Sequence, residues 1–411
     1  MKVELFNYNL PKEKIAQAPV RPRERAKMLY YNRCENVTRD FRVSDLPSLI
    51  KAGDLLVFNV TKVRHARLTE CRMQNADCRI KEVLILKPLL EDGQFECLIR
   101  GKNVEVSQEI IFKQRCDDKG TARLSTVILS GNEGSIPNQA NLEYGIWNEA
   151  VIPVKTGIHI KEIVATIINK QYQGIQTYTI QTNVSSSEFL RYCENFGELP
   201  LPPYIQNPQI HGFEDELYQP ITAKELGSVA APTASLHFSQ KILDELINRG
   251  VKYGEVILHV GLGTFLPVKV DDTDDHKMHS EEIEVSAELM QKIKEAKENG
   301  GRVIAIGTTV ARALESVGTN HGELSCITPS SHVILSEAEG SNIKEETNLF
   351  ITPGYEFKVI DGLLTNFHMP KSTLLMMVSA FIGREKLFEL YGYALKNDYR
   401  FLSFGDCMLL L

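Results

Sequence analysis

A possible nucleotide-binding turn lies in the stretch VILHVGLGTFLPVKV, residues 256–270. Gly261 and Gly263 follow a strand-like run, as in the turn of a methyltransferase or dinucleotide-binding site, and Thr264 and Phe265 come next. Such a site needs a helix directly after the turn, because the free N–H groups of that helix face the ligand. The residues that follow look extended, so the pattern disfavours a Rossmann loop. The glycines could still let the backbone approach a ligand closely.

Two histidines follow in the pattern HKMH, between two groups of carboxylates. On a helix, His276 and His279 would share a face and could bind a metal. No third ligand follows at a family spacing, and the eight cysteines include no CxxC, so we predict no metal site. Imidazole titrates near neutral pH. Two interpretations stay open: a site for proton transfer or substrate contact, and a hydrogen-bonded loop.

The segment MPKST, residues 369–373, is similar to the GKST of a phosphate-binding loop. Pro370 stands where that loop needs a glycine and offers no N–H, so a phosphate-binding loop is excluded. Lys371, Ser372 and Thr373 remain at the expected start of a helix, where free N–H groups attract an anion. The segment therefore either binds an anion or only caps the helix.

A basic segment, RPRERAK, contrasts with the net charge of −7. The first 70 residues carry +6 and the remainder −13. The acidic total argues against a general nucleic-acid coat, but Arg21, Arg23, Arg25 and Lys27 could contact phosphates. The alternative is an ordinary solvated surface.

The elements that must position these residues fall into two classes. Short alternating segments between about 66 and 135 predict a small antiparallel sheet or barrel: ARLTECRM, EVLILKPL, QFECLIRG, QEIIFKQ and ARLSTVIL. The C-terminal half alternates amphipathic helices (238–250 and 286–301) with apolar strands (253–263 and 302–309), which predicts an α/β domain. Residues 54–60 predict a buried strand, and residues 372–383 a buried helix. Residues 146–187 have no obvious role and are expected to be an atypical insertion.

The chain is expected to work in a reducing cytoplasm. Its cysteines are scattered, its first residues do not have the pattern of a signal peptide, and no apolar run is long enough for a membrane helix.

Taken together, the chain resembles the S-adenosylmethionine:tRNA ribosyltransferase-isomerases of queuosine biosynthesis. The matching segments follow in the order of that family: LPKEKIAQAP (10–19), RPRERAKML (21–29), DLLVFNVTKVRHARL (54–68), GELPLPPYI (197–205), VAAPTASLHF (229–238), LHVGLGTFLPV (258–268), HKMHSE (276–281), GTTVARALES (307–316), PGYEFKVIDGLLTNFHMPKSTLLMMVSAF (353–381) and YRFLSFGDCML (399–409).

The resemblance implies a large α/β domain that is discontinuous in sequence (1–65 and 191–411), with a small antiparallel β-barrel domain inserted at 66–190. It implies transfer and isomerisation of the ribosyl part of S-adenosylmethionine onto 7-aminomethyl-7-deazaguanine at the wobble position of tRNA, with release of adenine and methionine. No metal is implied. The tRNA anticodon stem-loop is the expected partner, and the protein is expected to be a monomer.

This chemistry needs a base, an acid and a substrate pocket. The candidate catalytic residues in family-matching segments are His237, His259, His276, His279, His368 and Asp361. The candidate substrate-binding residues are Gly261, Gly263, Thr264, Phe265, Tyr355, Phe367, Lys371, Ser372, Thr373 and Asp406. Asp361 and Asp406 could instead cap backbone, and most aromatic side chains at such spacing belong to the core. The candidate tRNA contacts are Arg21, Arg23, Arg25 and Lys27.

The sequence departs from the family pattern where Val60 replaces an aspartate. This departure and the insertion leave open a tRNA-binding protein without catalysis. An S-adenosylmethionine-dependent tRNA methyltransferase also stays open, because it would share both substrates.

Overall fold

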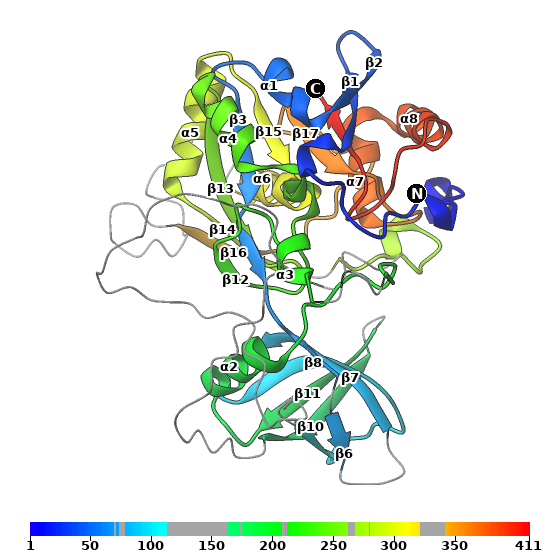
Figure 1. Cartoon of the computed structure of the whole chain (residues 1–411), viewed down its shortest axis with the longest axis vertical. Coiled ribbons are helices and arrows are strands. Elements are labelled where there is room, and N and C mark those ends of the chain that lie inside the picture. Colours follow the sequence, from blue (N-terminus) through cyan, green and yellow to red (C-terminus); the bar gives the residue numbers. More distant parts are fainter. Residues whose placement is uncertain are drawn as a thin grey trace, which may run out of the picture. The chain divides into compact units, whose positions relative to one another are not determined.

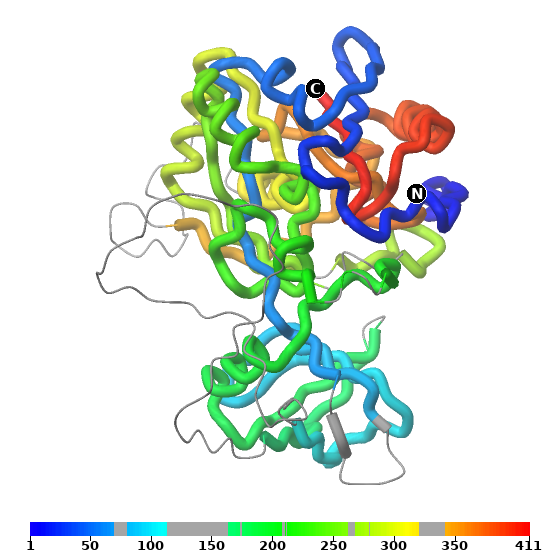
Figure 2. The backbone as a smooth tube through the Cα atoms, in the orientation of Figure 1, coloured from blue at the N-terminus to red at the C-terminus, as the bar shows by residue number. Residues whose placement is uncertain are grey.

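The computed structural model describes residues 1–69, 71–73, 79–112, 163–172, 175–207, 210, 212–261, 268–278, 280–320 and 342–411. These residues form two compact units: a large unit of residues 1–64 and 199–411, and a small unit of residues 65–198. In Figure 2 the chain runs from the blue part of the large unit into the cyan small unit, and returns in green.

The large unit contains a sheet of nine strands in the order β16-β14-β13-β3-β15-β17-β18-β1-β2. Its four central strands are parallel: β13 (Lys252–Leu258), β3 (Leu55–Asn59), β15 (Val303–Ile306) and β17 (Gly362–Asn366). The outer strands are β16 (Ile343–Thr347), β14 (Glu281–Val285), β18 (Cys407–Leu410), β1 (Lys27–Asn32) and β2 (Val37–Arg42). A short parallel pair, β4 (Thr61–Val63) and β12 (Glu225–Ser228), lies apart from this sheet.

Helices cover both faces of this sheet (Figure 1). In the wholly buried strand β3, Leu55 and Val57 belong to one core cluster, whereas Leu56 and Phe58 belong to another, since side chains alternate along a strand. The first cluster includes α5 (Ala287–Glu298), α6 (Thr308–Asn320), α7 (Thr373–Ile382) and α8 (Arg384–Lys396). The second includes α1 (Leu46–Leu49) and α4 (Gln240–Asn248). The expected α/β class is confirmed.

The helix ends follow from side-chain caps. The hydroxyl of Ser286 accepts a hydrogen bond from the N–H of Leu289 at the start of α5, and that of Ser372 accepts one from Leu375 at the start of α7. Gly383, at φ +86°, follows α7. Such caps satisfy N–H groups that have no partner within the helix.

The small unit contains a curled antiparallel sheet of seven strands in the order β5-β7-β8-β11-β10-β9-β6. Its strands are β5 (Arg67–Leu68), β6 (Cys71–Met73), β7 (Arg79–Pro88), β8 (Gln94–Lys102), β9 (Glu109–Phe112), β10 (Ile163–Tyr172) and β11 (Gln176–Thr182). Helix α2 (Ser186–Phe196) packs on it, with the Phe189 ring 4.9 Å from Phe95 and 5.3 Å from Phe112. A further short helix, α3 (Glu214–Leu217), belongs to the large unit.

Within the expected insertion at 146–187, residues 163–182 contribute two strands to this sheet. They are β10 and β11, and β11 lies between β8 and β10. Buried and half-buried side chains alternate along IVATI in β10, as expected for a strand that places one face on a core. Residues 146–162, and the expected strand at 122–129, lie outside the described residues. The small unit ends at residue 198 rather than 190, with α2 inside it. In the part of the chain that is described, no helix has the length and hydropathy to cross a membrane.

Candidate active site

A pocket in the large unit lies where three parallel strands end. Its empty volume, open solvent included, is about 700 Å³. It is lined by Val260 after β13, residues 307–309 after β15 and residues 367–369 after β17. The carboxyl ends of parallel strands are the usual place for ligand binding in an open α/β sheet.

A glycine turn connects β15 to α6 at this pocket. Gly307 has φ +103°, a conformation that favours glycine, and Thr308 begins the helix. A strand, a glycine turn and a helix therefore follow one another at Gly307. The sequence after GLG at 261–263 does not predict such a helix. The sequence IAIGTTVARAL, residues 304–314, carried that signal, but Gly307 and Thr308 were not among the predicted site residues.

Seven of the residues that line the pocket carry a hydroxyl group: Thr233, Thr308, Thr309, Thr365, Ser372, Ser403 and Tyr204. Tyr204 Oη and Ser403 Oγ are 2.6 Å apart, and burial raises the pKa of Tyr204 to about 12. The phenol is thus protonated at neutral pH. A lining of hydroxyl groups and strand-end backbone suits a ligand with many hydrogen-bonding groups, such as a nucleoside.

One predicted histidine lines this pocket, a second is hydrogen-bonded to a residue that lines it, and both are neutral. His368 lines it, and its Nε2 is 2.8 Å from Thr365 Oγ1. Burial lowers the pKa of His368 to about 3. His237, at the end of a short 3-10 helix (Thr233–His237), accepts a hydrogen bond at Nε2 from Asn366 Nδ2 at 3.2 Å. Burial, then the charges of Arg400 and Arg23, lower the pKa of His237 to about 4. Neutral imidazoles can accept protons, whereas imidazolium cannot.

The other described histidines do not line this pocket. His259 follows β13, and a Cβ on Gly227 would come within 2.6 Å of its ring, so Gly227 makes room for the imidazole. Burial lowers the pKa of His259, whose Nδ1 is buried without a hydrogen-bond partner among the described residues. His276 packs edge-on against Phe350, with ring centroids 5.1 Å apart. His279, and the loop residues Gly263, Thr264 and Phe265, lie outside the described residues.

Neighbouring residues at the start of α7 line two different cavities. Ser372 lines the pocket and caps the helix. Thr373 lines a smaller cavity beside it. Lys371 has φ +56°, and its Nζ lies 2.5 Å from a Glu4 carboxylate oxygen. The cation of this segment is thus already paired.

The two predicted aspartates bind backbone. Asp361 accepts a hydrogen bond from the N–H of Val303 at 2.9 Å, at the amino end of β15, opposite the strand ends that form the pocket. Asp406 is buried and accepts from the N–H groups of Lys27 and Arg400 at 2.9 and 2.7 Å. Burial raises the pKa of Asp406, although its hydrogen bonds with these two N–H groups act to lower that pKa.

Two of the predicted stacking rings are occupied by other contacts. The buried ring of Phe367 lies 4.6 Å from that of Phe401, in an aromatic cluster. Tyr355 Oη donates to the buried carboxylate of Glu315 at 3.1 Å and packs edge-on against Phe357. Phe367 also lines the pocket, whereas Tyr355 is not among its lining residues.

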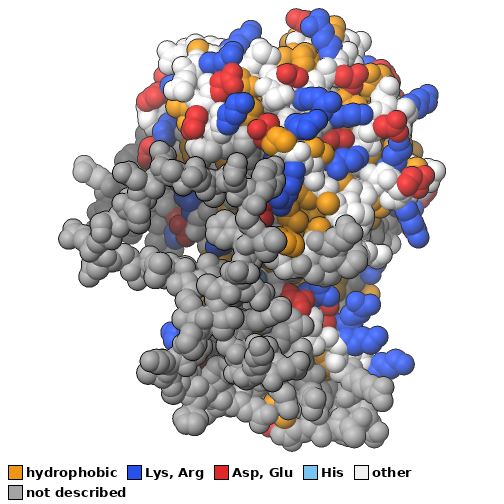
Figure 3. Space-filling model, viewed as in Figure 1, with side chains coloured by type: hydrophobic (Ala, Val, Ile, Leu, Met, Phe, Trp, Pro, Cys, Tyr) orange, Lys and Arg blue, Asp and Glu red, His pale blue; other side chains and the backbone are white. Residues whose placement is uncertain are grey.

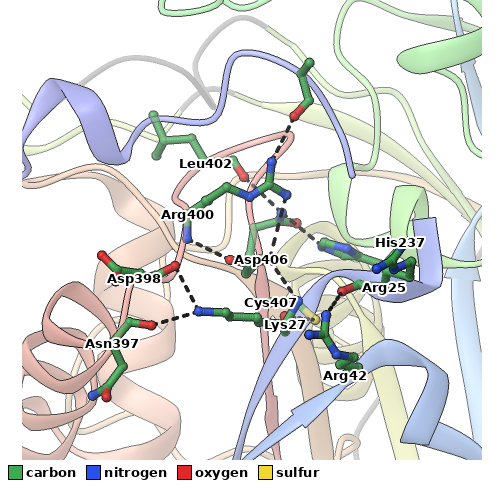
Figure 4. A network of polar contacts seen from close by, with 12 residues as sticks. Arg25, Lys27, Arg42, His237, Asn397, Asp398, Arg400, Leu402, Asp406 and Cys407 are labelled. Carbon is green, nitrogen blue, oxygen red and sulfur yellow. Dashed lines mark hydrogen bonds and ion pairs between the residues drawn. The ribbon is translucent and has the colours of Figure 1, made fainter. Parts of the chain in front are cut away.

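The basic segment is held mainly by contacts within the large unit. Arg21 pairs with Glu216 at 2.8 Å, and Arg23 donates to the backbone carbonyls of Gln219 and Glu216. Lys27 donates to the carbonyls that follow α8, at Asn397 (2.9 Å) and Asp398 (3.2 Å), as Figure 4 shows.

Arg25 differs from these three residues. Its carbonyl accepts from Arg42, while its side chain is exposed. The face that Figure 3 shows carries Lys and Arg side chains interspersed with Asp and Glu.

A buried ion pair was missed by the sequence analysis. The guanidinium of Arg312, on α6, contacts the carboxylate of Glu281, on β14; the two residues are 5% and 7% exposed. Glu281 Oε1 also accepts a hydrogen bond from the N–H of Gly261 at 2.9 Å. Gly261 is thus fixed by the residue that ends HKMHSE. Among the described residues, no cluster of three His, Cys, Asp or Glu side chains could hold a metal.

The comparisons with known proteins agree over the whole chain. A family model described as a queuosine biosynthesis protein matches residues 3–410. The S-adenosylmethionine:tRNA ribosyltransferase-isomerase of Zymomonas mobilis is 40% identical, covering 100% of this chain and 99% of that protein. That of Stenotrophomonas maltophilia is 39% identical, covering 100% and 98%. The crystal structure of an S-adenosylmethionine tRNA ribosyltransferase from Thermotoga maritima is 27% identical, covers 99% and 100%, and has a TM-score of 0.48. The chain therefore belongs to the family of queuosine biosynthesis proteins.

Proposed function

We propose that this protein is an S-adenosylmethionine:tRNA ribosyltransferase-isomerase. The observation that carries the proposal is the match to relatives of that name along their full length, at up to 40% identity among those compared. The pocket at the strand ends supports it, because the hydroxyl-bearing residues and the neutral His368 that line it suit a nucleoside substrate and proton transfer.

The substrate is S-adenosylmethionine, and the acceptor is 7-aminomethyl-7-deazaguanine at the wobble position of tRNA. A base takes a proton from the ribose C5′, which the sulfonium makes acidic, and adenine leaves. The acceptor amine attacks the opened ribosyl chain, epoxide closure expels methionine, and epoxyqueuosine results. His368 is the first candidate for the base, because it lines the pocket and is neutral. No metal takes part.

The pocket's hydroxyl groups and Ser372 bind the ribosyl donor, together with the loop that follows Gly261. His237 accepts a hydrogen bond from Asn366 and so positions a residue that lines the pocket. His279, Gly263, Thr264 and Phe265 stay candidates through their place in the sequence. Asp361, Asp406, Tyr355 and Phe367 act by holding backbone and core, a role that their hydrogen bonds and ring contacts support.

The partner is the anticodon stem-loop of tRNA, whose single-stranded wobble base can enter a pocket. Arg25 is the candidate phosphate contact, because its side chain is exposed. We further propose that the small unit is a β-barrel domain inserted into a discontinuous α/β domain, which the two compact units support. The protein acts as a monomer in the cytoplasm.

One incubation tests the activity. Purified protein, S-adenosylmethionine and tRNA carrying the aminomethyl-deazaguanine are mixed, and the small molecules are separated. We expect free adenine and methionine to appear in step with a gain in tRNA mass. S-adenosylhomocysteine would identify a methyltransferase instead. Binding of tRNA without any turnover would identify a protein that has lost catalysis.

A further inference from the structure

A second cavity lies at the starts of α6 and α7 in the large unit. In this conformation the space inside it is about the size of one water molecule, so a ligand enters only by displacing some of the side chains that line it. Thr308 and Thr309 of α6 and Thr373 of α7 line it. The first two residues, with Leu374, also line the larger pocket, so the two cavities adjoin. The free N–H groups of a helix start favour negative charge.

Arg312 supplies a buried cation to this cavity. Its side chain lines the space although the residue is only 5% exposed. Burial lowers the pKa of Arg312 to about 10, so the guanidinium is still charged at neutral pH. Its contact with Glu281 restrains it, while its Nε has no hydrogen-bond partner among the described residues. One guanidinium has five N–H donors and can bind two carboxylates.

The remaining walls of the cavity are apolar. They include Met278, Leu349, Phe350 and Met377. Thioether and aromatic side chains pack well against an unbranched, sulfur-containing chain. The cavity therefore combines a site for an anionic head with a site for a short apolar chain, which are the two parts of a methionine side chain and its carboxylate.

We infer that this cavity binds the methionine half of S-adenosylmethionine, with Arg312 holding its α-carboxylate and the adenosyl half extending into the larger pocket. The identity of the ligand rests on the proposed function. Lys371, the cation nearest in sequence to the start of α7, is instead paired with Glu4. Arg312 therefore replaces it as the carboxylate-binding residue.

Two ligands that differ by one group test the inference. Decarboxylated S-adenosylmethionine lacks only the carboxylate, so calorimetric titration of both ligands isolates its contribution. Because of the hydrogen-bonded charge pair, the wild type is expected to bind S-adenosylmethionine roughly 10- to 100-fold tighter than decarboxylated S-adenosylmethionine. The variant is Arg312→Met with Glu281→Gln, since removing Arg312 alone would leave a buried carboxylate uncompensated. The amide oxygen that the second substitution introduces can still accept a hydrogen bond from the Gly261 N–H.

The matched control changes another ion pair with a buried carboxylate. Arg302 and Asp54 are 2.6 Å apart at the amino ends of β15 and β3, where they are remote from both cavities. Arg302→Met with Asp54→Asn should keep the preference for the carboxylate. Thermal unfolding and L-methionine binding are measured for all three proteins, and only the Arg312 variant should lose L-methionine binding.

The inference is supported if the preference disappears in the Arg312 variant alone. It is overturned if the wild type shows no preference, if the Arg312 variant keeps it, or if the wild type binds neither S-adenosylmethionine nor L-methionine. Adenine release by the wild type is scored separately. Release without the preference refutes only the inference. If the wild type prefers S-adenosylmethionine to its decarboxylated form through Arg312 but releases no adenine, only the proposed function is refuted.

Discussion

Acid should destabilise the large unit in a pH range set by two buried histidines. His237 and His368 are neutral in the folded protein because burial lowers their pKa values to about 4 and about 3. In the unfolded chain they titrate near pH 6.5. As the pH falls below 6.5, the unfolded chain binds protons that the folded protein does not, so stability decreases and levels off only below the folded pKa values.

The magnitude follows from proton linkage. With an unfolded pKa of 6.5, lowering the pH from 7 to 5 costs about 2 kcal/mol for each histidine, or about 4 kcal/mol for both. A folded domain is typically stable by about 5–15 kcal/mol, so this loss is a large fraction of the total.

Urea unfolding at pH 7 and pH 5, followed by circular dichroism, measures the difference. His368→Asn and His237→Asn should each reduce the pH difference by about 2 kcal/mol, because one titrating group is removed. Thr365→Val is the control: it removes the 2.8 Å hydrogen bond to His368, so it should lower stability by about 1 kcal/mol at both pH values. An equal pH difference in the wild type and both histidine variants would refute the reasoning.

Two substitutions in the basic segment separate tRNA binding from stability. Arg25→Ala should leave the unfolding midpoint unchanged and should reduce the slope of log K for tRNA against log salt by about 0.7–0.9. Arg23→Ala should lower stability, because Arg23 donates hydrogen bonds to backbone carbonyls. Equal salt slopes for Arg25→Ala and the wild type would contradict the role of Arg25. Gly227→Ala should cost about 1–3 kcal/mol of stability, because the new Cβ would lie 2.5 Å from the His259 ring. Much of the lost stability should be recovered when His259→Ala is added in the same chain. If it is not recovered, the His259 ring is not the cause of the loss.

Most elements of the large unit could be predicted because local pattern and final environment agree. The apolar run at 54–60 forms β3, and the amphipathic pattern at 286–301 forms α5 between a serine cap and glycines. The strand at 163–172 was missed, although IVATI alternates, because it stood in a segment that matched no expected motif.

The site was predictable only where one short segment carries the signal. Ser372 was expected at a helix start and caps α7. The pair of Glu281 and Arg312 could not be inferred, because residues 31 positions apart on a strand and a helix meet only through the packing of α6 against the sheet. The same holds for Lys371, whose partner Glu4 lies at the other end of the sequence.

The order of strands in the large sheet also has a consequence for synthesis of the protein. Among the described strands, β1 pairs with β2 on one side and with β18 on the other. The central strand β3 has β13 and β15 as its neighbours (Figure 1). A ribosome makes β1 long before β18, and β3 long before β13 and β15. One edge of β1 and both edges of β3 must therefore wait unpaired, while the small unit, whose described strands all lie within residues 67–182, can fold first. Newly made chains that stall before β18 should be recognised by chaperones rather than accumulate as folded protein.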